Sequence, residues 1–556
     1  MNTFTAVTDA VGGSLGLSAL VATIPLLAFF VMLIGMKASA HVSAAVATLT
    51  AIVVAIFGFH MPLDLALMAT LRGSLFGIMP VVWVIMTAIW FYQITVASGR
   101  FEDLRRTFDK LGDGDVRIQA ILIAFCFGGL LEALAGFGAP VAITATMILA
   151  LGIKPLKAAT VVLLANTAPV AFGAVAIPIT TVGAVAGRST EQTMNIAAIV
   201  GHQAPLIAVF VPILLLFILD GFKGVKEAWI PGLIIGISFA VAQWATSNYF
   251  AYQLTDVVAC IVSLGAAFIF LRFWNPRGIE EMRARMDLPP AATKEELPGI
   301  RIWMALMPYA VVTFIFGIAN LQGPIKTLLT QAKITLDWPL LAERLVNAQG
   351  EPIKSAYSLE LLRNPGTLLL FSGIIVSIIY MIFNENGKYP LTAGAVVNEF
   401  SHTLYRMRWS AVTIGLVLGL AYVMNYSGQT VAIGEYVASL GGVYAFLAPS
   451  LGWVGTAVTG SDTSANALFG KMQLTAAQGA GINPDLMLAA NTTGGVVGKM
   501  ISPQSLAIAA TAVDYEGRES EIFKAVVGWS FGLLLVVCSL VYLQSDILSF
   551  MIPVVN

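Results

Sequence analysis

Residues 449–482 read PSLGWVGTAVTGSDTSANALFGKMQLTAAQGAGI, where a polar run interrupts sequence otherwise apolar enough for a membrane span. The polar run, Ser461 to Asn466, follows Gly460 and consists mainly of serine, threonine, aspartate and asparagine, the side chains that most often cap a helix N-terminus. One helix should therefore end near Gly460 and another should begin directly after it. Irregular backbone at membrane depth is tolerated only where protein or a water-filled cavity surrounds it. The stretch predicts a re-entrant hairpin with its polar tip inside the protein.

The composition of the whole chain agrees with a membrane protein. Of its 556 residues, 58% are hydrophobic and only 11% are charged, against about a quarter charged in soluble proteins. These values argue against a soluble enzyme, a disordered scaffold and a secreted disulfide-rich module. The 30 Lys and Arg residues balance 31 Asp and Glu residues, so no basic excess indicates nucleic-acid binding. The three cysteines lie far apart in apolar runs, and we expect neither a disulfide framework nor a metal site.

Apolar runs near the length of a membrane span recur along the chain. About 20 apolar residues cross the hydrocarbon core. Two further long stretches, 118–187 and 445–511, are apolar but interrupted by polar residues, glycine and proline. We therefore predict an all-α integral membrane protein with about 12 transmembrane helices, two re-entrant hairpins (118–152 and 449–482) and two broken helices (157–187 and 486–512). The uninterrupted runs are 18–36, 42–59, 75–97, 197–219, 229–245, 257–271, 302–319, 368–382, 411–424 and 523–543.

The distribution of Lys and Arg predicts the orientation, because cytoplasmic loops are enriched in these residues. Five of them crowd residues 100–117 and six crowd residues 272–301. With both segments in the cytoplasm, the first hairpin enters from the cytoplasm and the second from outside. Both termini then lie outside, and 321–365 becomes an external loop.

Landmarks in the two halves of the chain recur in the same order, 324 to 329 residues apart. Five matches in order predict an inverted repeat, with residues 1–272 as the first unit, 273–301 as a cytoplasmic loop and 302–556 as the second unit. That layout is typical of alternating-access transporters, which bind a solute near the bilayer midplane between their repeats. The recurring pairs are Pro62 and Pro390, Ser98 and Ser427, Gly136 and Gly460, Gly152 and Gly481, and Asn166 and Asn491.

The tip of the first hairpin reads Gly136-Phe137-Gly138-Ala139-Pro140. The glycines permit a tight turn and the proline suits the first turn of a helix. We expect a helix N-terminus that points into the protein and favours an anion. The alternative is a packing turn between two apolar helices.

The tip of the second hairpin carries more polar groups than a helix cap requires. One N-capping residue accounts for one of its five polar side chains. We therefore expect a ligand site rather than capping alone, and we place Ser461, Thr463, Ser464 and Asn466 in it.

Each hairpin precedes a predicted helix break that begins with Asn-Thr. In the first break, Asn166-Thr167 precedes a proline, which removes a backbone donor. The second break is expected at Asn491-Thr492-Thr493-Gly494-Gly495, followed by Lys499, Ser502 and Gln504. These residues are interpreted as binding groups. The alternatives are a kinked helix whose hydroxyls bond to their own backbone, or a packing seam, since Gly494-x-x-x-Gly498 is also a helix-contact pattern.

Three ionisable residues, Glu132, Asp462 and Lys499, lie deep in apolar sequence. A charge at mid-membrane costs about 2.5–3.5 kcal/mol, so each must be paired, protonated or hydrated. Asp462 and Lys499 are candidates for a neutralising pair. Alternatively, Glu132 or Asp462 accepts a proton while Lys499 holds an anionic solute. His202, beside Gln203 in an apolar run, is a further candidate for a proton relay.

Four strings in these segments resemble the L-lactate permease family of bacterial lactate and glycolate:proton symporters, and the resemblance extends through most crossing segments. It implies an inner-membrane, multi-pass carrier that imports lactate, and glycolate or related 2-hydroxy monocarboxylates, with H⁺ by alternating access. Ala133 and Ala465 stand where members often have Gly and Ser, and the loops 273–301 and 321–365 match poorly. The strings are 136–144 (GFGAPVAIT), 166–173 (NTAPVAFG), 460–469 (GSDTSANALF) and 491–505 (NTTGGVVGKMISPQS).

Two other functions remain open on the residues alone. A Na⁺-coupled carboxylate transporter is possible because unwound backbone and the Asn-Thr pairs suit Na⁺ as well. A membrane enzyme or energy-coupling subunit would need a connected series of ionisable residues, a metal or a haem site, and the sequence offers no pattern for these. We therefore expect a transporter, not an enzyme, with H⁺ as coupling ion and no cofactor. Its partners would be a monocarboxylate and the lipid bilayer, and no oligomeric state follows from the sequence.

Overall fold

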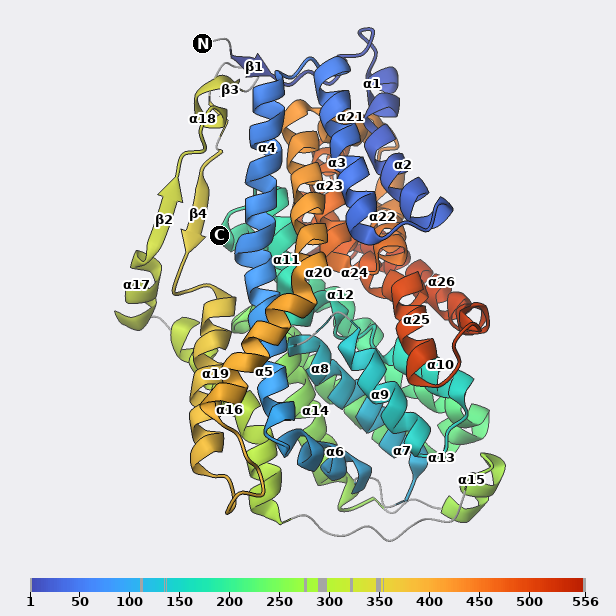
Figure 1. Ribbon diagram of the computed structural model, residues 1–556. Coiled ribbons are helices and arrows are strands. Elements are labelled where there is room, and N and C mark those ends of the chain that lie inside the picture. The colour runs from blue at the N-terminus through green and yellow to red at the C-terminus, as the bar shows by residue number, and fades with distance from the viewer. Residues whose placement is uncertain are drawn as a thin grey trace.

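The computed structural model describes residues 3–553, except 111–113, 135, 137, 275–277, 289–297, 321–323, 347–351 and 354. Helices dominate (Figure 1), which confirms the predicted all-α membrane fold. In the described residues there are four short strands. β1 (Phe4–Thr5) pairs in parallel with β3 (Leu345–Val346), and β2 (Lys333–Leu336) pairs antiparallel with β4 (Tyr357–Glu360). Three of these strands lie in the segment 321–365 that was predicted as an external loop.

The described chain contains ten helical runs long and apolar enough to cross a membrane, or 11 if the bent pair at 155–185 counts as one span. One run, Thr190–Tyr249, is 60 residues long and contains non-helical residues at Asp220, Gly221 and Ala228. A multi-pass membrane protein is therefore confirmed. The predicted number of about 12 crossings stays a prediction.

The helices of the first half surround its hairpin and its broken helix. Their bounds are α1 (Leu15–Ala22), α2 (Ile24–Phe30), η1 (Val31–Gly35), α3 (Ala40–Phe57), α4 (Leu63–Phe76), η2 (Gly77–Val82), α5 (Trp83–Ala97), α6 (Arg100–Lys110), α7 (Val116–Ile121), η3 (Leu122–Phe127), α8 (Gly128–Leu134), α9 (Ala139–Ala150), α10 (Pro155–Ala165), η4 (Val170–Phe172), α11 (Gly173–Val185), α12 (Thr190–Ala208), α13 (Val211–Tyr249), η5 (Tyr252–Leu254), α14 (Thr255–Leu271) and α15 (Ile279–Arg285).

The second half continues after α15 with a similar series. Its helices are α16 (Gly299–Asn320), α17 (Pro324–Gln331), α18 (Leu341–Arg344), α19 (Pro365–Ile382), α20 (Ala393–Ser427), α21 (Gln429–Ala438), α22 (Val443–Thr459), α23 (Asp462–Ala480), α24 (Pro484–Gly498), η6 (Lys499–Ile501), α25 (Pro503–Ala512), α26 (Glu519–Gln544) and η7 (Ser549–Met551).

The order of elements recurs between the halves at a nearly constant offset. The pairs α6 and α21, α10 and α24, and α12 and α26 each begin 329 residues apart, as do η4 and η6 (499 − 170 = 329). The pairs α4 and α20, and α11 and α25, begin 330 residues apart. This recurrence supports an internal repeat. The unit boundaries at 272 and 302, and the opposite orientation of the units in the membrane, stay predictions.

Two helical runs of 35 residues each form a crossed pair along the molecule. The continuous run α4–η2–α5 and α20 lie side by side in Figure 1 and pack directly against each other. Glycines permit the close approach: a Cβ at Gly77 would lie 2.9 Å from the Cα of Gly415, and one at Gly419 would lie 2.7 Å from Oγ of Ser74. Small residues let helix backbones approach closely in this way.

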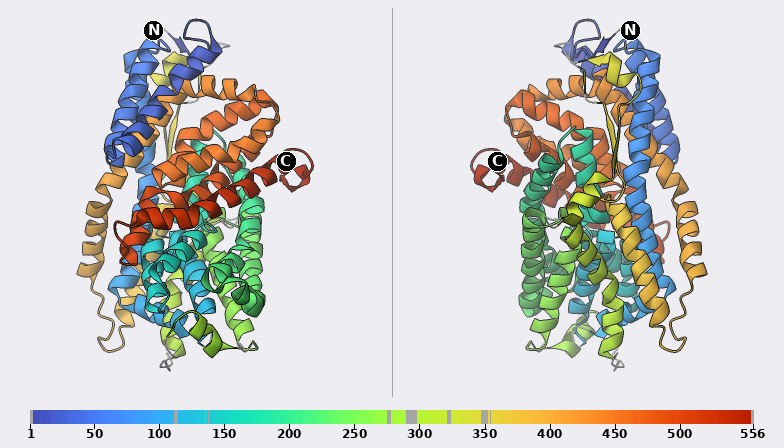
Figure 2. Two further views of the ribbon diagram at one scale, coloured as in Figure 1. Left: turned by 90° about the vertical axis from the view of Figure 1, so that its right-hand side faces the viewer. Right: turned by 90° about the vertical axis from the view of Figure 1, so that its left-hand side faces the viewer.

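Each predicted re-entrant hairpin coincides with a pair of helical segments, and its re-entrant character stays a prediction. The first consists of the buried run α7–η3–α8 and of α9, and the second consists of α22 and α23. The second begins at Val443, six residues before the predicted start, because Pro449 lies inside α22. In Figure 2 the orange and red helices of the second hairpin lie above the cyan helices of the first. Entry from opposite membrane faces stays a prediction.

The two Arg-rich loops lie at the same end of the molecule. Figure 1 shows α6 and α15 at the bottom, whereas the N-terminus is at the opposite end. Arg301 at the start of α16 forms an ion pair with Asp103 of α6. The shared end is what the predicted orientation requires, and the orientation itself stays a prediction.

Both helices that follow the hairpins are broken, but one break lies elsewhere than predicted. The first helix bends by 59° between α10 and α11, at the predicted Asn166–Pro169. In the second helix, Asn491–Gly495 is regular α24 and the break comes at 499–502, so the predicted position was wrong. The glycines there serve close packing: a Cβ at Gly494 would overlap the carbonyl of Pro449, and one at Gly498 that of Trp453. The packing-seam alternative is therefore correct.

Candidate functional site

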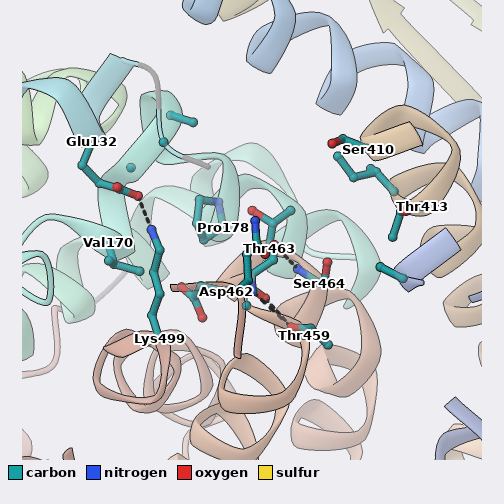
Figure 3. Close-up of a pocket in the computed structure, with 18 residues that line it drawn as sticks. Glu132, Val170, Pro178, Ser410, Thr413, Thr459, Asp462, Thr463, Ser464 and Lys499 are labelled. Carbon is teal, nitrogen blue, oxygen red and sulfur yellow. Dashed lines mark hydrogen bonds and ion pairs between the residues drawn. The ribbon is translucent and has the colours of Figure 1, made fainter. Parts of the chain in front are cut away.

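The two hairpins and the two helix breaks meet at a cavity of about 230 Å³. We call it the central cavity (Figure 3). It lies where helices end or begin, so backbone groups without intrahelical partners are concentrated around it. Its described lining residues are Ala40, Glu132, Gly136, Val170, Gly173, Ala174, Pro178, Ser410, Thr413, Ile414, Thr459, Gly460, Ser461, Asp462, Thr463, Ser464, Lys499 and Gln504.

A buried ion pair lies at one end of the central cavity. Lys499, the first residue of η6, places its Nζ 2.5 Å from Oε1 of Glu132 at the end of α8. Asn166, the C-cap of α10, donates from Nδ2 to the other carboxylate oxygen at 3.0 Å. Glu132 and Lys499 are 3% and 8% exposed. The ion pair joins the first hairpin to the second break, and the hydrogen bond of Asn166 joins it to the first break. Lys499 does not contact Asp462, its predicted partner.

The surroundings of Glu132 leave little free space. A Cβ at Gly173, where α11 begins, would lie 3.0 Å from Oε1 of Glu132. The next three residues, Ala174 to Ala176, have left-handed backbone with φ between 43° and 60°. This conformation costs a non-glycine residue roughly 1–2 kcal/mol. The segment that borders the ion pair is therefore held in an unfavourable backbone conformation by its packing.

Asp462 lines the same cavity and is 3% exposed. Its Oδ1 accepts a hydrogen bond from Oγ1 of Thr456 at 3.4 Å, and its Oδ2 has no partner among the described residues. A Cβ at Gly495 would overlap Oδ1, so glycine there makes room for the carboxyl group. An unsatisfied buried carboxyl oxygen beside a cavity is a binding group for a ligand, a water molecule or a proton.

The second hairpin tip divides its polar groups between capping and the cavity. Oγ of Ser461 accepts from the backbone N–H of Ser464, and Oγ1 of Thr459 accepts from the backbone N–H of Ser461. The side-chain hydroxyls of Thr463 and Ser464 face the cavity, and the described part of the chain offers them no partner. Capping therefore accounts for Ser461, and two hydroxyls remain for a solute.

Four of the predicted binding residues lie behind the cavity, three of them in one hydrogen-bonded network and Thr493 in a separate contact. Nδ2 of Asn466 donates to the carbonyl of Pro178 and to Thr492, and Nδ2 of Asn491 donates to Oδ1 of Asn466 at 2.7 Å. Thr493 donates to Gln203 at 2.6 Å. All four are buried and none lines the cavity. The network joins α23 and α24 to α11.

Several other predicted residues support the cavity walls. Gly136 lines the cavity and Gly138 is the N-cap of α9, both at positive φ, while Phe137 lies outside the described residues. Thr167 donates to the carbonyl of Leu164. Ser502 caps α25. Gln504 lines the cavity, where a Cβ at Gly460 would lie 2.5 Å from its Oε1.

His202 does not line the central cavity. Its Nδ1 lies 2.8 Å from the carbonyl of Ala198, and its Nε2 accepts from Nε1 of Trp244 at 3.1 Å. This pattern fits a neutral imidazole with its proton on Nδ1. The predicted relay role therefore finds no support in the geometry and stays a prediction.

The far wall of the cavity, which was not predicted from the sequence, is formed by α20 and the start of α3. Ser410 and Thr413 face the cavity opposite the ion pair (Figure 3), and Ala40 borders them. Serine and threonine are common in membrane helices, so neither stands out. The usable signal was Gly415 and Gly419, whose four-residue spacing marks α20 as a helix that packs closely against another.

No group of three or more His, Cys, Asp or Glu residues able to hold a metal ion occurs among the residues that the structure describes. The chemistry available at the central cavity is thus one cation, two carboxyl groups, hydroxyls and helix termini. Such a set has the chemical groups that binding a small anion and exchanging a proton would require.

Comparisons with known proteins agree along almost the whole chain. Residues 18–548 match the family model described as L-lactate permease. The chain is 39% identical to the L-lactate permease of Bacillus subtilis, covering 98% of both chains. It is 38% identical to the glycolate permease GlcA of Escherichia coli, covering 97% of this chain and 98% of the relative. The solved YdaH transporter of Alcanivorax borkumensis aligns over 87% of this chain and 88% of its own at 16% identity, with a TM-score of 0.45.

Proposed function

The chain belongs to the L-lactate permease family, and we propose that it imports lactate, and also glycolate, together with protons by alternating access. It is a multi-pass inner-membrane protein, and its family consists of permeases rather than enzymes. The names of its relatives, L-lactate permease and glycolate permease, support a 2-hydroxy monocarboxylate as the substrate. The Glu132–Lys499 pair in the central cavity carries the proposal for the coupling ion.

The ion pair couples the anion to a proton through charge balance. When the substrate carboxylate binds Nζ of Lys499, Glu132 loses its counter-ion in a buried site. An unpaired buried charge is strongly unfavourable, so a proton on Glu132 must accompany the anion. The loaded site then holds neutral Glu132, Lys499 and the carboxylate, which carry the same net charge as the empty pair. Either ligand alone leaves one charge unpaired, and this penalty couples their transport.

The second hairpin tip suits the remaining groups of the substrate. Thr463 and Ser464 offer hydroxyls that can hydrogen-bond a 2-hydroxyl group. The N-terminus of α23 contributes partial positive charge on the same side. One lysine without a paired arginine matches a single carboxylate better than a dicarboxylate or a phosphate.

Radiolabelled L-lactate uptake into proteoliposomes tests the proposal. The liposomes carry an imposed pH gradient, alkaline inside, in Na⁺ medium and in medium with K⁺ in place of Na⁺. We expect the pH gradient to drive accumulation equally in both media, glycolate to compete, and a protonophore to abolish accumulation. D-lactate competition reports stereoselectivity. Accumulation that requires Na⁺, or that does not respond to the pH gradient, would overturn proton coupling. A requirement for Na⁺ would support the Na⁺-coupled alternative.

A further inference from the structure

A second cavity, of about 280 Å³, lies against a neighbouring face of α11. Ile177, Thr180 and Ala184 of α11 line this cavity, whereas Ala174 and Pro178 of the same helix line the central cavity. Helix α11 is therefore a wall shared by the two. We call the second cavity the antechamber. Its other walls come from the η2–α5 junction, the start of α12, η5, and the segment from β4 to the start of α19.

The antechamber has an arginine available for an anion. Arg363 lines it, and the described residues offer its guanidinium no hydrogen bond or ion pair. Arg188 lines it too but forms an ion pair with Asp485, which also accepts from Nδ2 of Asn195 at 2.9 Å. Glu360 is the carboxylate among the described lining residues. Arg363 is thus the lining cation that has no assigned partner.

Two helix N-termini reinforce the positive character around Arg363. Asn364 and Pro365 begin α19, and Thr190 begins α12, and all three line the antechamber. Helix N-termini carry partial positive charge. Thr180 and Tyr252, whose hydroxyl oxygens lie 3.1 Å apart, add groups able to bond a 2-hydroxyl. The combination of arginine, helix ends and hydroxyls resembles the chemistry of the central cavity, built from different residues.

The segment that carries Arg363 is hydrogen-bonded to α4 and η2. Arg72 of α4 donates from Nε to the carbonyl of Ser355 at 2.6 Å and from Nη2 to that of Ala356 at 2.8 Å. The hydroxyl of Tyr357 donates to the carbonyl of Met79 in η2. The antechamber is therefore a preformed site, and binding there requires little ordering of the chain.

We propose that the antechamber is a second binding site for the monocarboxylate, in which Arg363 captures the carboxylate before it passes α11 into the central cavity. This proposal rests on the proposed function, because it takes the same substrate class. The proposed passage requires the wall to move, and we place the hinge of that movement at the left-handed start of α11, Ala174–Ala176. Capture by a guanidinium raises the local concentration of an anion at the entrance, and salt weakens the effect.

Four variants test the proposal in the pH-driven uptake assay, with initial rates measured against L-lactate concentration at low and high ionic strength. R363K keeps the positive charge at the lining position. R363Q removes the guanidinium. E360Q removes the carboxylate from the same cavity. K333Q is the matched control, because Lys333 is an exposed residue of β2 in the same segment and does not line the antechamber.

We expect R363Q to raise the KM for lactate about tenfold, the equivalent of about 1.4 kcal/mol, with the maximal rate and the pH dependence unchanged. The salt dependence of KM should weaken in R363Q. E360Q should lower KM, R363K should stay within about threefold of the unaltered protein, and K333Q should match it.

An unchanged KM in R363Q would overturn the antechamber proposal. A fall in maximal rate with unchanged KM would also overturn it, since that pattern indicates a structural role. If R363Q fails to fold, E360Q decides: an unchanged or higher KM overturns the proposal. The unaltered protein separates the two proposals, because absence of pH-driven lactate uptake by that protein would overturn the proposed function and the antechamber with it.

Discussion

Lys499 and Glu132 form the buried ion pair of the central cavity, and their separation by 367 residues means that only the folded chain brings them together. Each residue stands out in the sequence as a charge in apolar surroundings. The pairing follows from the structure, because η6 directs Lys499 toward the end of α8 rather than toward Asp462.

Replacing Lys499 by Gln removes the cation that binds the substrate carboxylate. We expect kcat/KM for lactate uptake to fall by about 10- to 100-fold, because a hydrogen bond to a charged group contributes about 1.5–3 kcal/mol. Initial uptake rates measure the effect, and K524Q, at an exposed position of α26, is the control. Uptake within about threefold of the unaltered protein would contradict the assigned role.

Replacing Asp462 by Asn separates the two candidate proton acceptors. Asp462 lines the cavity but does not contact Lys499, so its charge is not exchanged for that of the substrate. We expect D462N to lower the maximal rate about tenfold, since the polar tip is disturbed, while uptake still responds to the pH gradient. If lactate accumulation by D462N no longer responds to the pH gradient, then Asp462 rather than Glu132 is the proton acceptor.

At the scale of elements, the packing of α22 against α24 fixes the position of the second break. Gly494 faces the backbone carbonyl of Pro449 with no room for a methyl group. We expect G494A to destabilise the protein by about 1–3 kcal/mol, the usual effect of overpacking. Thermal unfolding in detergent measures it. Control G528A, on α26 where nothing lies within 4 Å, should leave stability equal or higher. Equal stability of G494A and G528A would contradict the close packing of α22 against α24 at Gly494.

The sequence predicted the elements better than their internal details. Gly152 and Gly481 predicted both hairpin ends, because glycine with Pro three residues later marks a helix end and a new start. The second break was misplaced because matching Asn166 to Asn491 implies an offset of 325, whereas the elements recur at 329 and pair Val170 with Lys499. Glycine marks flexibility and close packing alike, so Gly494 alone does not distinguish them.

The residues of the candidate site that could be predicted from the sequence are those whose charge is unusual in apolar surroundings. Glu132, Asp462 and Lys499 are charges in apolar sequence, and the structure brings all three to one cavity. Polar residues that satisfy one another, such as Asn466 and Asn491, have the same sequence signature as ligand-binding ones. Ser410 and Thr413 are ordinary residues for a membrane helix, so the sequence does not mark them. Their place in the cavity wall follows from the way α20 crosses the molecule.

For the whole molecule, the exchange of one anion and one proton for an internal ion pair predicts electroneutral transport. A membrane potential contributes about 2.3 kcal/mol per charge per 100 mV, so an electrogenic carrier would accumulate lactate in response to it. We expect a valinomycin-induced K⁺ potential at zero pH gradient to drive no accumulation in proteoliposomes. Accumulation under that potential would contradict a stoichiometry of 1:1.

The most direct test of the coupling mechanism is lactate transport by E132Q, measured in two modes with the same proteoliposomes. Glutamine imitates the protonated carboxyl group, so it leaves Lys499 free for the substrate and removes the proton from the cycle. The account predicts that E132Q exchanges internal lactate for labelled external lactate at a rate independent of pH, yet accumulates none in response to a pH gradient. Gradient-driven accumulation by E132Q at the level of the unaltered protein would contradict it.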